Sequence, residues 1–166
     1  MGTSPSHRSG QAAVELLRDA FAALNRKDLD AGTEMLTEDF VINIAGMPFQ
    51  MHGRDAWRQN VSVMRTAFPD FQVRIEDIFG SDDRVAVLLT MRGTHQGEFR
   101  GIPATGRRVE YTSAELYRVA DGRIAEEWIY SDTETLMRQL DGSDGSDGSD
   151  GADGADGADG AGAPDA

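Results

Sequence analysis

Four long runs of alternating apolar and polar residues follow one another in the second half of the sequence, and they restrict the possible folds strongly. They cover residues 71–79, 84–95, 107–119 and 123–131. Alternation with a period of two is typical of strands that bury one face. Turn-forming segments such as Gly80-Ser-Asp-Asp83 separate successive runs, which favours antiparallel neighbours. The sequence therefore predicts an antiparallel meander.

Helical patterns precede these strands. Residues 11–26 and 55–68 each carry apolar side chains at intervals of three and four, which is typical of one buried helical face. Asp28 is placed to cap a short helix between them, residues 40–45 are expected to form a further strand, and Pro69 ends the later helix. This order predicts an α+β fold in which a curved antiparallel sheet packs on the N-terminal helices and encloses an apolar pocket.

The last 26 residues differ in composition from the rest of the chain. From Asp141 onward, Asp-Gly-Ser and Asp-Gly-Ala triplets repeat without any aromatic or large aliphatic side chain. Such a segment buries too little apolar surface to offset its chain entropy. We therefore expect a disordered N-terminus at residues 1–10, one folded domain at residues 11–140 and a disordered tail at residues 141–166.

Charge and composition exclude several classes of function. The tail holds eight Asp residues and no Lys or Arg, so the net charge of −13 becomes −5 for the rest of the chain, which argues against a nucleic-acid partner. The absence of cysteine excludes disulfides and thiolate chemistry. Neither a secretory signal nor an apolar run long enough to cross a bilayer is found, so we expect a cytoplasmic protein without a membrane partner.

Several short motifs resemble those of a known family in their order and spacing. The most specific is Gly93–Arg107, with the sequence GTHQGEFRGIPATGR. It is preceded by Phe68-Pro-Asp70 and followed by residues 121–128, DGRIAEEW, with Asp132 four residues further on. Together the motifs span nearly the whole predicted domain. On these residues the chain resembles the SnoaL-like polyketide cyclases, which belong to the nuclear transport factor 2-like superfamily.

This resemblance has implications for fold, activity and site. It implies a cone-shaped α+β fold, frequently dimeric, whose pocket binds a polyketide or another hydrophobic small molecule. The best understood members close a ring by intramolecular aldol condensation, and they use no metal or organic cofactor. The resemblance also implies an aspartate that acts as general acid or base on the strand after the tryptophan, and Asp132 is the matching position. We therefore expect a homodimeric, cofactor-free cyclase of antibiotic biosynthesis.

The surroundings of Asp132 allow two roles. Trp128 and Tyr130 share its side of the strand, provided that no bulge intervenes. A carboxyl group beside aromatic rings and an apolar cavity is poorly solvated as an anion, so its pKa is expected to rise toward the range useful for proton transfer. The alternative is structural, because an aspartate before Thr133-Glu134 fits the N-cap of a final helix. The two roles are compatible.

Three polar residues are candidate partners of Asp132. His95, at the end of the most apolar strand, either acts in catalysis or holds the glycine-rich loop that follows it. Asn43 either donates a hydrogen bond to an enolate oxygen or bonds to neighbouring backbone. Arg118 and Glu115 have opposite parity in the penultimate strand, so only one of them faces the cavity. We favour Arg118, as an electrostatic stabiliser.

Large apolar residues supply the expected pocket wall, although residues with this spacing also serve as plain core. The candidates for substrate binding are Trp57, Met64, Phe68, Met91, Phe99, Trp128 and Tyr130. The three histidines are too dispersed along the chain to suggest a metal site, so no metal is expected.

Two other functions remain open on the same fold. One is that of the epoxide hydrolases and epoxide-opening cyclases, whose resemblance implies a different set of residues, two carboxylates bridged by an arginine. Asp132 with Arg118 would supply part of this set. The third possibility is a non-catalytic module that binds a small ligand or dimerises, in which case Asp132 only caps a helix.

Overall fold

The computed structural model describes residues 5–143, with side chains from residue 9 onward. Its elements are α1 (Pro5–Asn25), α2 (Leu29–Glu34), β1 (Leu36–Ile44), β2 (Met51–His52), α3 (Arg54–Ala67), β3 (Gln72–Ser81), β4 (Arg84–Thr94), β5 (Arg108–Ala120), β6 (Arg123–Ser131) and α4 (Thr133–Asp141). Helix α1 begins before residue 11, the predicted start, while the meander strands lie close to their predicted bounds. The expectations for residues 1–4 and 144–166 fall outside the described residues.

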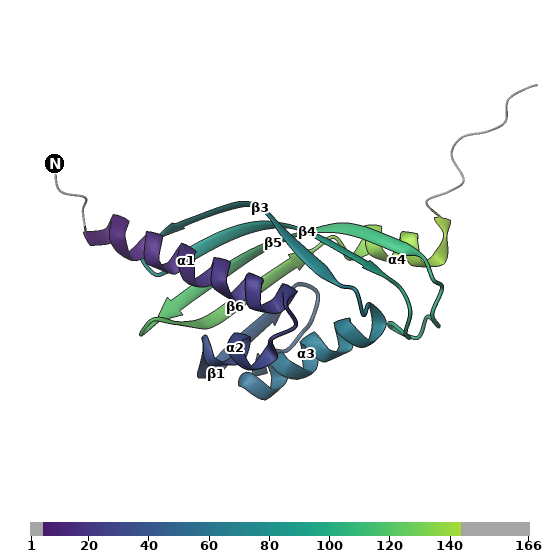
Figure 1. Ribbon diagram of the computed structural model, residues 1–166, viewed down its shortest axis with the longest axis horizontal. Coiled ribbons are helices and arrows are strands. Elements are labelled where there is room, and N and C mark those ends of the chain that lie inside the picture. Colours follow the sequence, from purple (N-terminus) through teal and green to yellow (C-terminus); the bar gives the residue numbers. More distant parts are fainter. Residues whose placement is uncertain (1–4, 144–166) are drawn as a thin grey trace, which may run out of the picture.

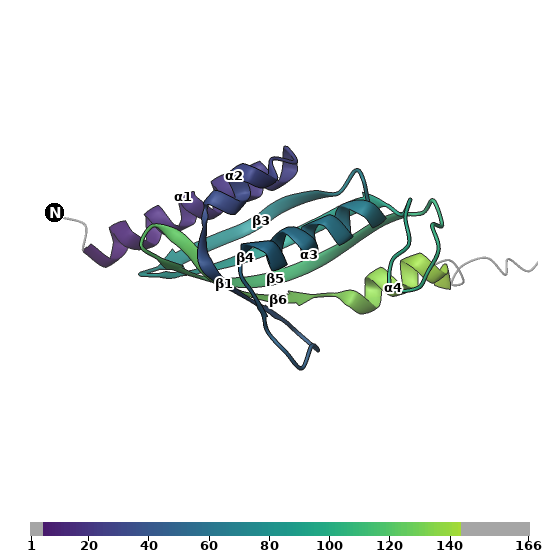
Figure 2. The same ribbon diagram turned by 90° about the horizontal axis from the view of Figure 1, so that it is seen from below.

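One curved sheet contains all six strands, in the order β2-β1-β6-β5-β4-β3. Helices α1, α2 and α3 lie on one face of it, and α4 lies near the ends of the central strands (Figures 1 and 2). Strands β3 to β6 form the predicted antiparallel meander. Strand β1 pairs with β6 in parallel, so the prediction of an antiparallel sheet is wrong for this pair. A long connection separates the two strands, and no hairpin imposes an antiparallel direction on them.

The hydrophobic core lies between the sheet and the helices. Leu17 and Phe21 of α1 are buried there against strand residues such as Leu89, which is fully buried. Asp28 caps α2 as predicted, because its carboxylate accepts a hydrogen bond of 3.0 Å from the backbone N–H of Ala31. Within residues 5–143, no helix has the length and apolar character needed to cross a membrane.

Strand β6 contains a bulge that decides which of its side chains reach the interior. Arg118 of β5 pairs with Glu126, but the next residue, Val119, pairs with Ile124. Ala125 is therefore an extra residue without a partner in β5, and the alternation of β6 shifts by one position. As a result Ile124 and Glu127 lie on the same face of the sheet, three residues apart, and this face is directed toward the helices.

Candidate active site

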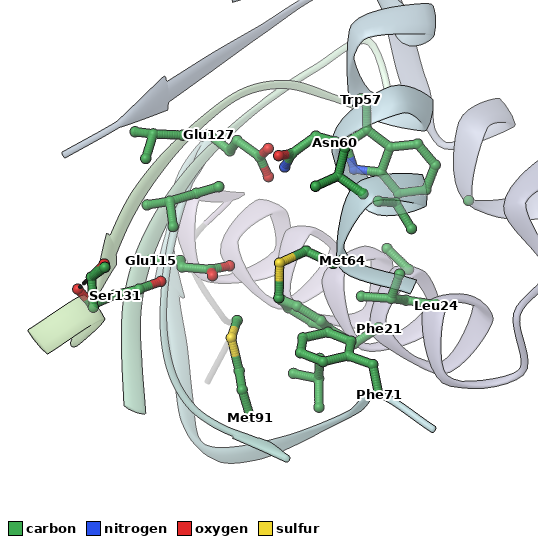
Figure 3. Close-up of a pocket in the computed structure, with 18 of the residues that line it drawn as sticks. Phe21, Leu24, Trp57, Asn60, Met64, Phe71, Met91, Glu115, Glu127 and Ser131 are labelled. Atoms are coloured by element: carbon green, nitrogen blue, oxygen red, sulfur yellow. Dashed lines mark hydrogen bonds between the residues drawn. The ribbon is translucent and has the colours of Figure 1, made fainter. Parts of the chain in front are cut away.

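A cavity of about 450 Å³ lies between the sheet and helices α1 to α3. Its wall is mostly apolar and combines side chains from both layers, including Phe21 and Met64 from helices and Phe71 from the start of the sheet (Figure 3). Four residues predicted for the pocket wall line this cavity, namely Trp57, Met64, Met91 and Phe99. A cavity of this size and polarity is typical of a binding site for a hydrophobic small molecule.

Glu115 is one of two buried carboxyl groups in this cavity. It lies on the inward face of β5 with only 4% of its surface exposed. One carboxylate oxygen accepts a hydrogen bond of 3.0 Å from the Ser113 hydroxyl, and the other accepts one from the Tyr117 hydroxyl. Burial raises the pKa of Glu115, while the hydrogen bonds from Tyr117 and Ser113 oppose this rise because they stabilise the anion.

Glu127 is the second buried carboxyl group, and its surroundings differ. It is 5% exposed, and within residues 5–143 no group donates a hydrogen bond to its side chain. Burial, and then the negative charge of Glu115, raise its pKa well above the ordinary value. The amide of Asn60, on α3, points toward the Glu127 carboxyl group across the cavity (Figure 3).

The register of β5 and β6 sets the spacing of the two acids. Glu127 stands opposite Tyr117, and Glu115 stands opposite Ile129, so the two glutamates are diagonal neighbours on one face. Such neighbours have backbones about 7–8 Å apart, within reach of long side chains. Two nearby carboxyl groups in unequal environments ionise at different pH values. The arrangement therefore favours ionisation of Glu115 before Glu127.

A short chain of hydroxyl groups continues from Glu115 along the sheet. The Ser113 hydroxyl, which donates to Glu115, lies 2.9 Å from the hydroxyl of Ser131 in the neighbouring strand. Ser113 is buried, whereas Ser131 is half-buried and lines the cavity. Glu115 thus belongs to a connected polar network in an otherwise apolar region.

Asp132 lies outside this cavity. It is exposed and caps α4, where its carboxylate accepts a 3.0 Å hydrogen bond from the backbone N–H of Thr135. This hydrogen bond lowers the pKa of Asp132, so the expected rise is wrong. The parity argument placed Asp132 on the same side as Trp128 and Tyr130, but that side is the outer face of the sheet. The structure supports the capping role and leaves the catalytic role a prediction.

His95 is fully buried but does not line the cavity. Its Nδ1 accepts a hydrogen bond of 3.2 Å from the backbone N–H of Thr105 and lies 3.0 Å from the Thr105 hydroxyl. Its ring packs against Phe68, with 5.4 Å between centroids. Phe68 is itself fully buried in the core and does not line the cavity. These contacts fit the structural alternative, in which His95 holds the glycine-rich loop.

The expected placement of Arg118 is wrong, because Glu115 takes the inward side of β5. Arg118 forms an ion pair of 3.3 Å with Glu126 outside the cavity. Asn43 does not line the cavity either: its amide donates hydrogen bonds to the Glu126 side chain and to the Glu127 carbonyl. These contacts match the structural alternative for Asn43.

Trp128 and Tyr130 also lie away from the cavity. The Arg84 guanidinium stands over the Trp128 ring at 5.4 Å, and Tyr130 is 54% exposed. Both were expected in the wall because an unbroken alternation would have placed them with Asp132. The same assumption placed Glu127 on the outer face. Its inward position depends on the bulge at Ala125, which the alternation of the sequence does not reveal. Asn60 is a polar residue on the face of α3 that carries Trp57 and Met64. Its helical spacing from these two residues could have indicated that it lines the cavity.

Metal-ligating side chains do not gather anywhere in residues 5–143, since no group of three His, Asp or Glu residues there could hold an ion. Among the described residues, the polar groups on the side chains that line the cavity are instead carboxyls, hydroxyls, one amide, one guanidinium and the indole N–H of Trp57. These groups can transfer protons and bind oxygen atoms of a ligand.

Sequence comparison identifies the class of protein to which this fold and this cavity belong. A family model described as SnoaL-like polyketide cyclase matches residues 13–140. The chain therefore belongs to the SnoaL-like polyketide cyclase family, as the sequence motifs predicted. It is similar to the nogalonic acid methyl ester cyclase of Streptomyces nogalater, with 29% identity over 123 residues, or 72% of this chain and 90% of the relative.

Solved structures agree with this assignment. IdmH from Streptomyces antibioticus, a proposed polyketide cyclase, is 34% identical and has a TM-score of 0.69, with 78% of this chain and 98% of IdmH covered. AclR from Streptomyces galilaeus, a proposed hydroxylase, is 30% identical with a TM-score of 0.73, covering 81% of this chain and 98% of AclR. The fold class is confirmed, and the relatives support a polyketide cyclase enzyme.

Proposed function

We propose that this protein is a cytoplasmic cyclase that closes a ring in a polyketide-type intermediate by an intramolecular aldol reaction, with Glu115 as general base and Glu127 as general acid. The observation that carries the proposal is the pair of buried carboxyl groups, unequally hydrogen-bonded, in a cavity whose walls are otherwise mostly apolar. Two such groups suffice for both proton transfers of an aldol reaction, so no cofactor is required.

The reaction needs a carboxylate and a carboxylic acid at the same time. The Glu115 carboxylate takes a proton from a carbon next to a carbonyl group of the substrate. The resulting enolate attacks a second carbonyl carbon of the same molecule and forms the new carbon–carbon bond. Glu127 then gives its proton to the oxygen of that second carbonyl, which becomes a hydroxyl group. The product is an isomer of the substrate, so the atoms balance without oxidant or reductant, and return of the proton from Glu115 to Glu127 restores both acids for the next turnover.

The different environments of the two acids assign their roles. Ser113 and Tyr117 donate hydrogen bonds to Glu115, and such donors favour the anion that a base must be. Glu127 has no donor among the described residues and is disfavoured as an anion by burial and by Glu115. A carboxyl group that stays protonated near neutral pH can act as an acid.

Neither alternative function is favoured by these positions. The epoxide-opening constellation requires an arginine between two carboxylates, but Arg118 and Asp132 both lie outside the cavity. A pure binding module gains nothing from two desolvated carboxyl groups, which reduce the stability of the fold near neutral pH. Buried carboxyl groups with raised pKa values are typical of catalytic sites, which favours the enzyme over the binding module.

Turnover of defined substrates tests the proposal. We would supply nogalonic acid methyl ester and aklanonic acid methyl ester, the compounds named in relatives of this chain, and follow ring closure by mass spectrometry and NMR. Glu115→Gln and Glu127→Gln should each lower kcat/KM by about 10²-fold or more, the usual contribution of general acid–base catalysis. Asp132→Asn is the matched carboxyl control and should stay within a few-fold of the wild type. Loss of activity in Asp132→Asn alone would instead restore Asp132 as the catalytic group.

A further inference from the structure

One positive charge reaches the cavity. Among the described residues that line it, Arg100 is the only Lys or Arg, whereas three glutamates line the same space: Glu98, Glu115 and Glu127. Within residues 5–143, Arg100 forms no ion pair with any of these carboxylates. An unpaired guanidinium at the edge of an acidic, apolar cavity is free to bind an oxygen atom of a ligand.

The loop backbone holds Arg100 in place. Phe99 and Ile102 exchange two backbone hydrogen bonds, of 3.0 and 2.9 Å, which close a tight turn around Arg100 and Gly101. Within this turn Arg100 has a φ of 50°, in the left-handed region that a non-glycine residue rarely adopts. A residue held in such a conformation by its surroundings is more frequent at ligand sites than elsewhere.

The side chain of Phe99 anchors this turn to the core. Phe99 is 7% exposed, and its ring packs on the buried Phe68 with 5.5 Å between centroids. The Arg100 guanidinium stands over the Phe99 ring at 5.5 Å. The ring therefore supports the guanidinium from one side, so its hydrogen-bonding edge remains available to the cavity.

Tyr111 lines the same cavity as Arg100 and the acid pair. Tyr111 lies on the inward face of β5, lines the cavity and makes no side-chain hydrogen bond within residues 5–143. Burial and the charge of Glu115 raise the pKa of Tyr111, while the charge of Arg100 opposes that rise. Because Tyr111, Arg100 and Glu115 line one cavity, the phenol and the guanidinium can contact the same ligand as the base.

We propose that Arg100 and the Tyr111 hydroxyl form an enolate-binding subsite, and that the substrate is an apolar molecule with a 1,3-dicarbonyl group. This inference rests on the proposed function, since Glu115 would generate the enolate that the subsite holds. A 1,3-dicarbonyl compound gives an enolate whose charge is shared by two oxygen atoms. A guanidinium and a phenol can donate to both, which stabilises the charge that develops when the proton leaves carbon.

A pair of fluorescent ligands tests the anion preference without any turnover. The probes are 8-anilinonaphthalene-1-sulfonate and N-phenyl-1-naphthylamine, which share their ring system and differ in the anionic group. Arg100→Gln should weaken binding of the sulfonate by about fivefold, the range of one partly exposed charge contact, and leave the neutral amine within twofold. Competition between the two probes establishes that they occupy one cavity. Equal sulfonate affinity in wild type and Arg100→Gln would overturn the subsite.

Two further variants separate charge at the cavity from general effects. Glu98→Gln is the matched control on the same loop and should leave sulfonate binding unchanged or tighter, because it removes a negative charge. Weaker binding by Glu98→Gln, to the extent seen for Arg100→Gln, would contradict the proposal. Arg100→Lys keeps the charge but not the planar fork and should bind the sulfonate with an affinity between those of the wild type and Arg100→Gln.

Dibenzoylmethane, an apolar 1,3-dicarbonyl compound, tests the enolate directly. Its enolate absorbs at longer wavelength than the neutral form, so the pH of ionisation of the bound compound can be followed spectroscopically. Wild-type protein should shift that ionisation to lower pH than Arg100→Gln or Tyr111→Phe. An identical ionisation pH in all three proteins would overturn the enolate assignment. Glu115→Gln removes a negative charge and should retain or enlarge this shift, and Glu127→Gln should retain it, so failure of the cyclase mechanism and failure of the subsite are distinguishable.

Discussion

Glu115 and Glu127 face the same cavity from adjacent strands, yet within residues 5–143 only Glu115 receives hydrogen bonds from side chains. Their proximity alone would give two equivalent acids that share one proton. The donors on one side break this equivalence, because hydrogen bonds to a carboxylate stabilise its charged form. A base and an acid can therefore coexist at one pH, as an aldol reaction requires.

Relative to the wild type, Glu127→Gln should become more resistant to heat as the pH rises. The pKa of Glu127 is raised in the folded state, so the folded wild type binds more protons than the unfolded chain above about pH 4.3 and loses stability from there upward. Glutamine does not titrate. The free energy of unfolding of the variant should increase relative to that of the wild type from pH 4 to pH 7, by at most about 1.4 kcal/mol per pH unit, and the difference in Tm should widen with it. Calorimetry at several pH values measures this, and a constant difference would show that Glu127 ionises normally.

Tyr117→Phe should make Glu115 harder to ionise. The variant removes one of the two hydroxyl donors to the carboxylate, and a hydrogen bond to a charged group contributes about 1.5–3 kcal/mol. The pKa of Glu115 should therefore rise by about one to two pH units, which ¹³C NMR of the glutamate carboxyl groups reports directly. The acidic limb of the pH profile of kcat/KM should move to higher pH with it. Ser113→Ala should shift both in the same direction, and an unmoved titration in both variants would remove the basis for assigning the base.

Asp132 should matter for stability and little for catalysis. Its carboxylate accepts the first-turn hydrogen bond of α4, a role that asparagine performs as well and alanine does not. Asp132→Ala should lower Tm by a few degrees, whereas Asp132→Asn should leave it nearly unchanged, and both should retain wild-type kcat within a few-fold. Thermal melts and the turnover assay decide together. If Asp132→Asn melts normally but is inactive, the catalytic prediction for Asp132 is right.

The family resemblance implies a homodimer, and we expect the outer face of the sheet to mediate it. Leu88, Leu116 and Tyr130 are 46%, 48% and 54% exposed, and the strand pairing brings them together through Ala114 and Trp128. An exposed apolar patch of this kind is typical of an association surface. Leu116→Arg should convert a dimer to a monomer in analytical ultracentrifugation. Phe49→Arg, a matched change at an exposed residue of the β1–β2 loop, should not; a monomeric wild type would refute the prediction.

Much of the fold could be predicted from local sequence patterns. The periodicities of α3 and of the meander, the cap at Asp28 and the stop at Pro69 depend on neighbouring residues alone, and the structure contains all of them. The parallel pairing of β1 with β6 depends on contacts between segments more than eighty residues apart. No local pattern encodes that direction, since either orientation would bury the same side chains.

The candidate site was predicted only in part, because it depends on which face each strand turns inward. The wall residues on α3 and β4 followed from uninterrupted periodicity, as Met64 and Met91 show. On β5, Glu115 shares the parity of buried Tyr111 and Tyr117, and this alternation indicates that Glu115 faces inward and Arg118 does not. On β6, the bulge at Ala125 reverses the alternation, so a regular pattern selects the wrong residues from that point onward.

That bulge also indicates how a protein of this kind can change its chemistry. If β6 lost this bulge and kept Ala125 in regular pairing, Ala125 would stand opposite Arg118 and Glu126 opposite Tyr117, so that Glu126 and Trp128 would replace Glu127 and Ile129 beside the ligand. No codon for a functional residue would need to be altered. The register of this hairpin is therefore a variable that protein engineers can use to obtain new reactivity on this scaffold, and alignments that ignore the bulge will pair residues from opposite faces of the sheet.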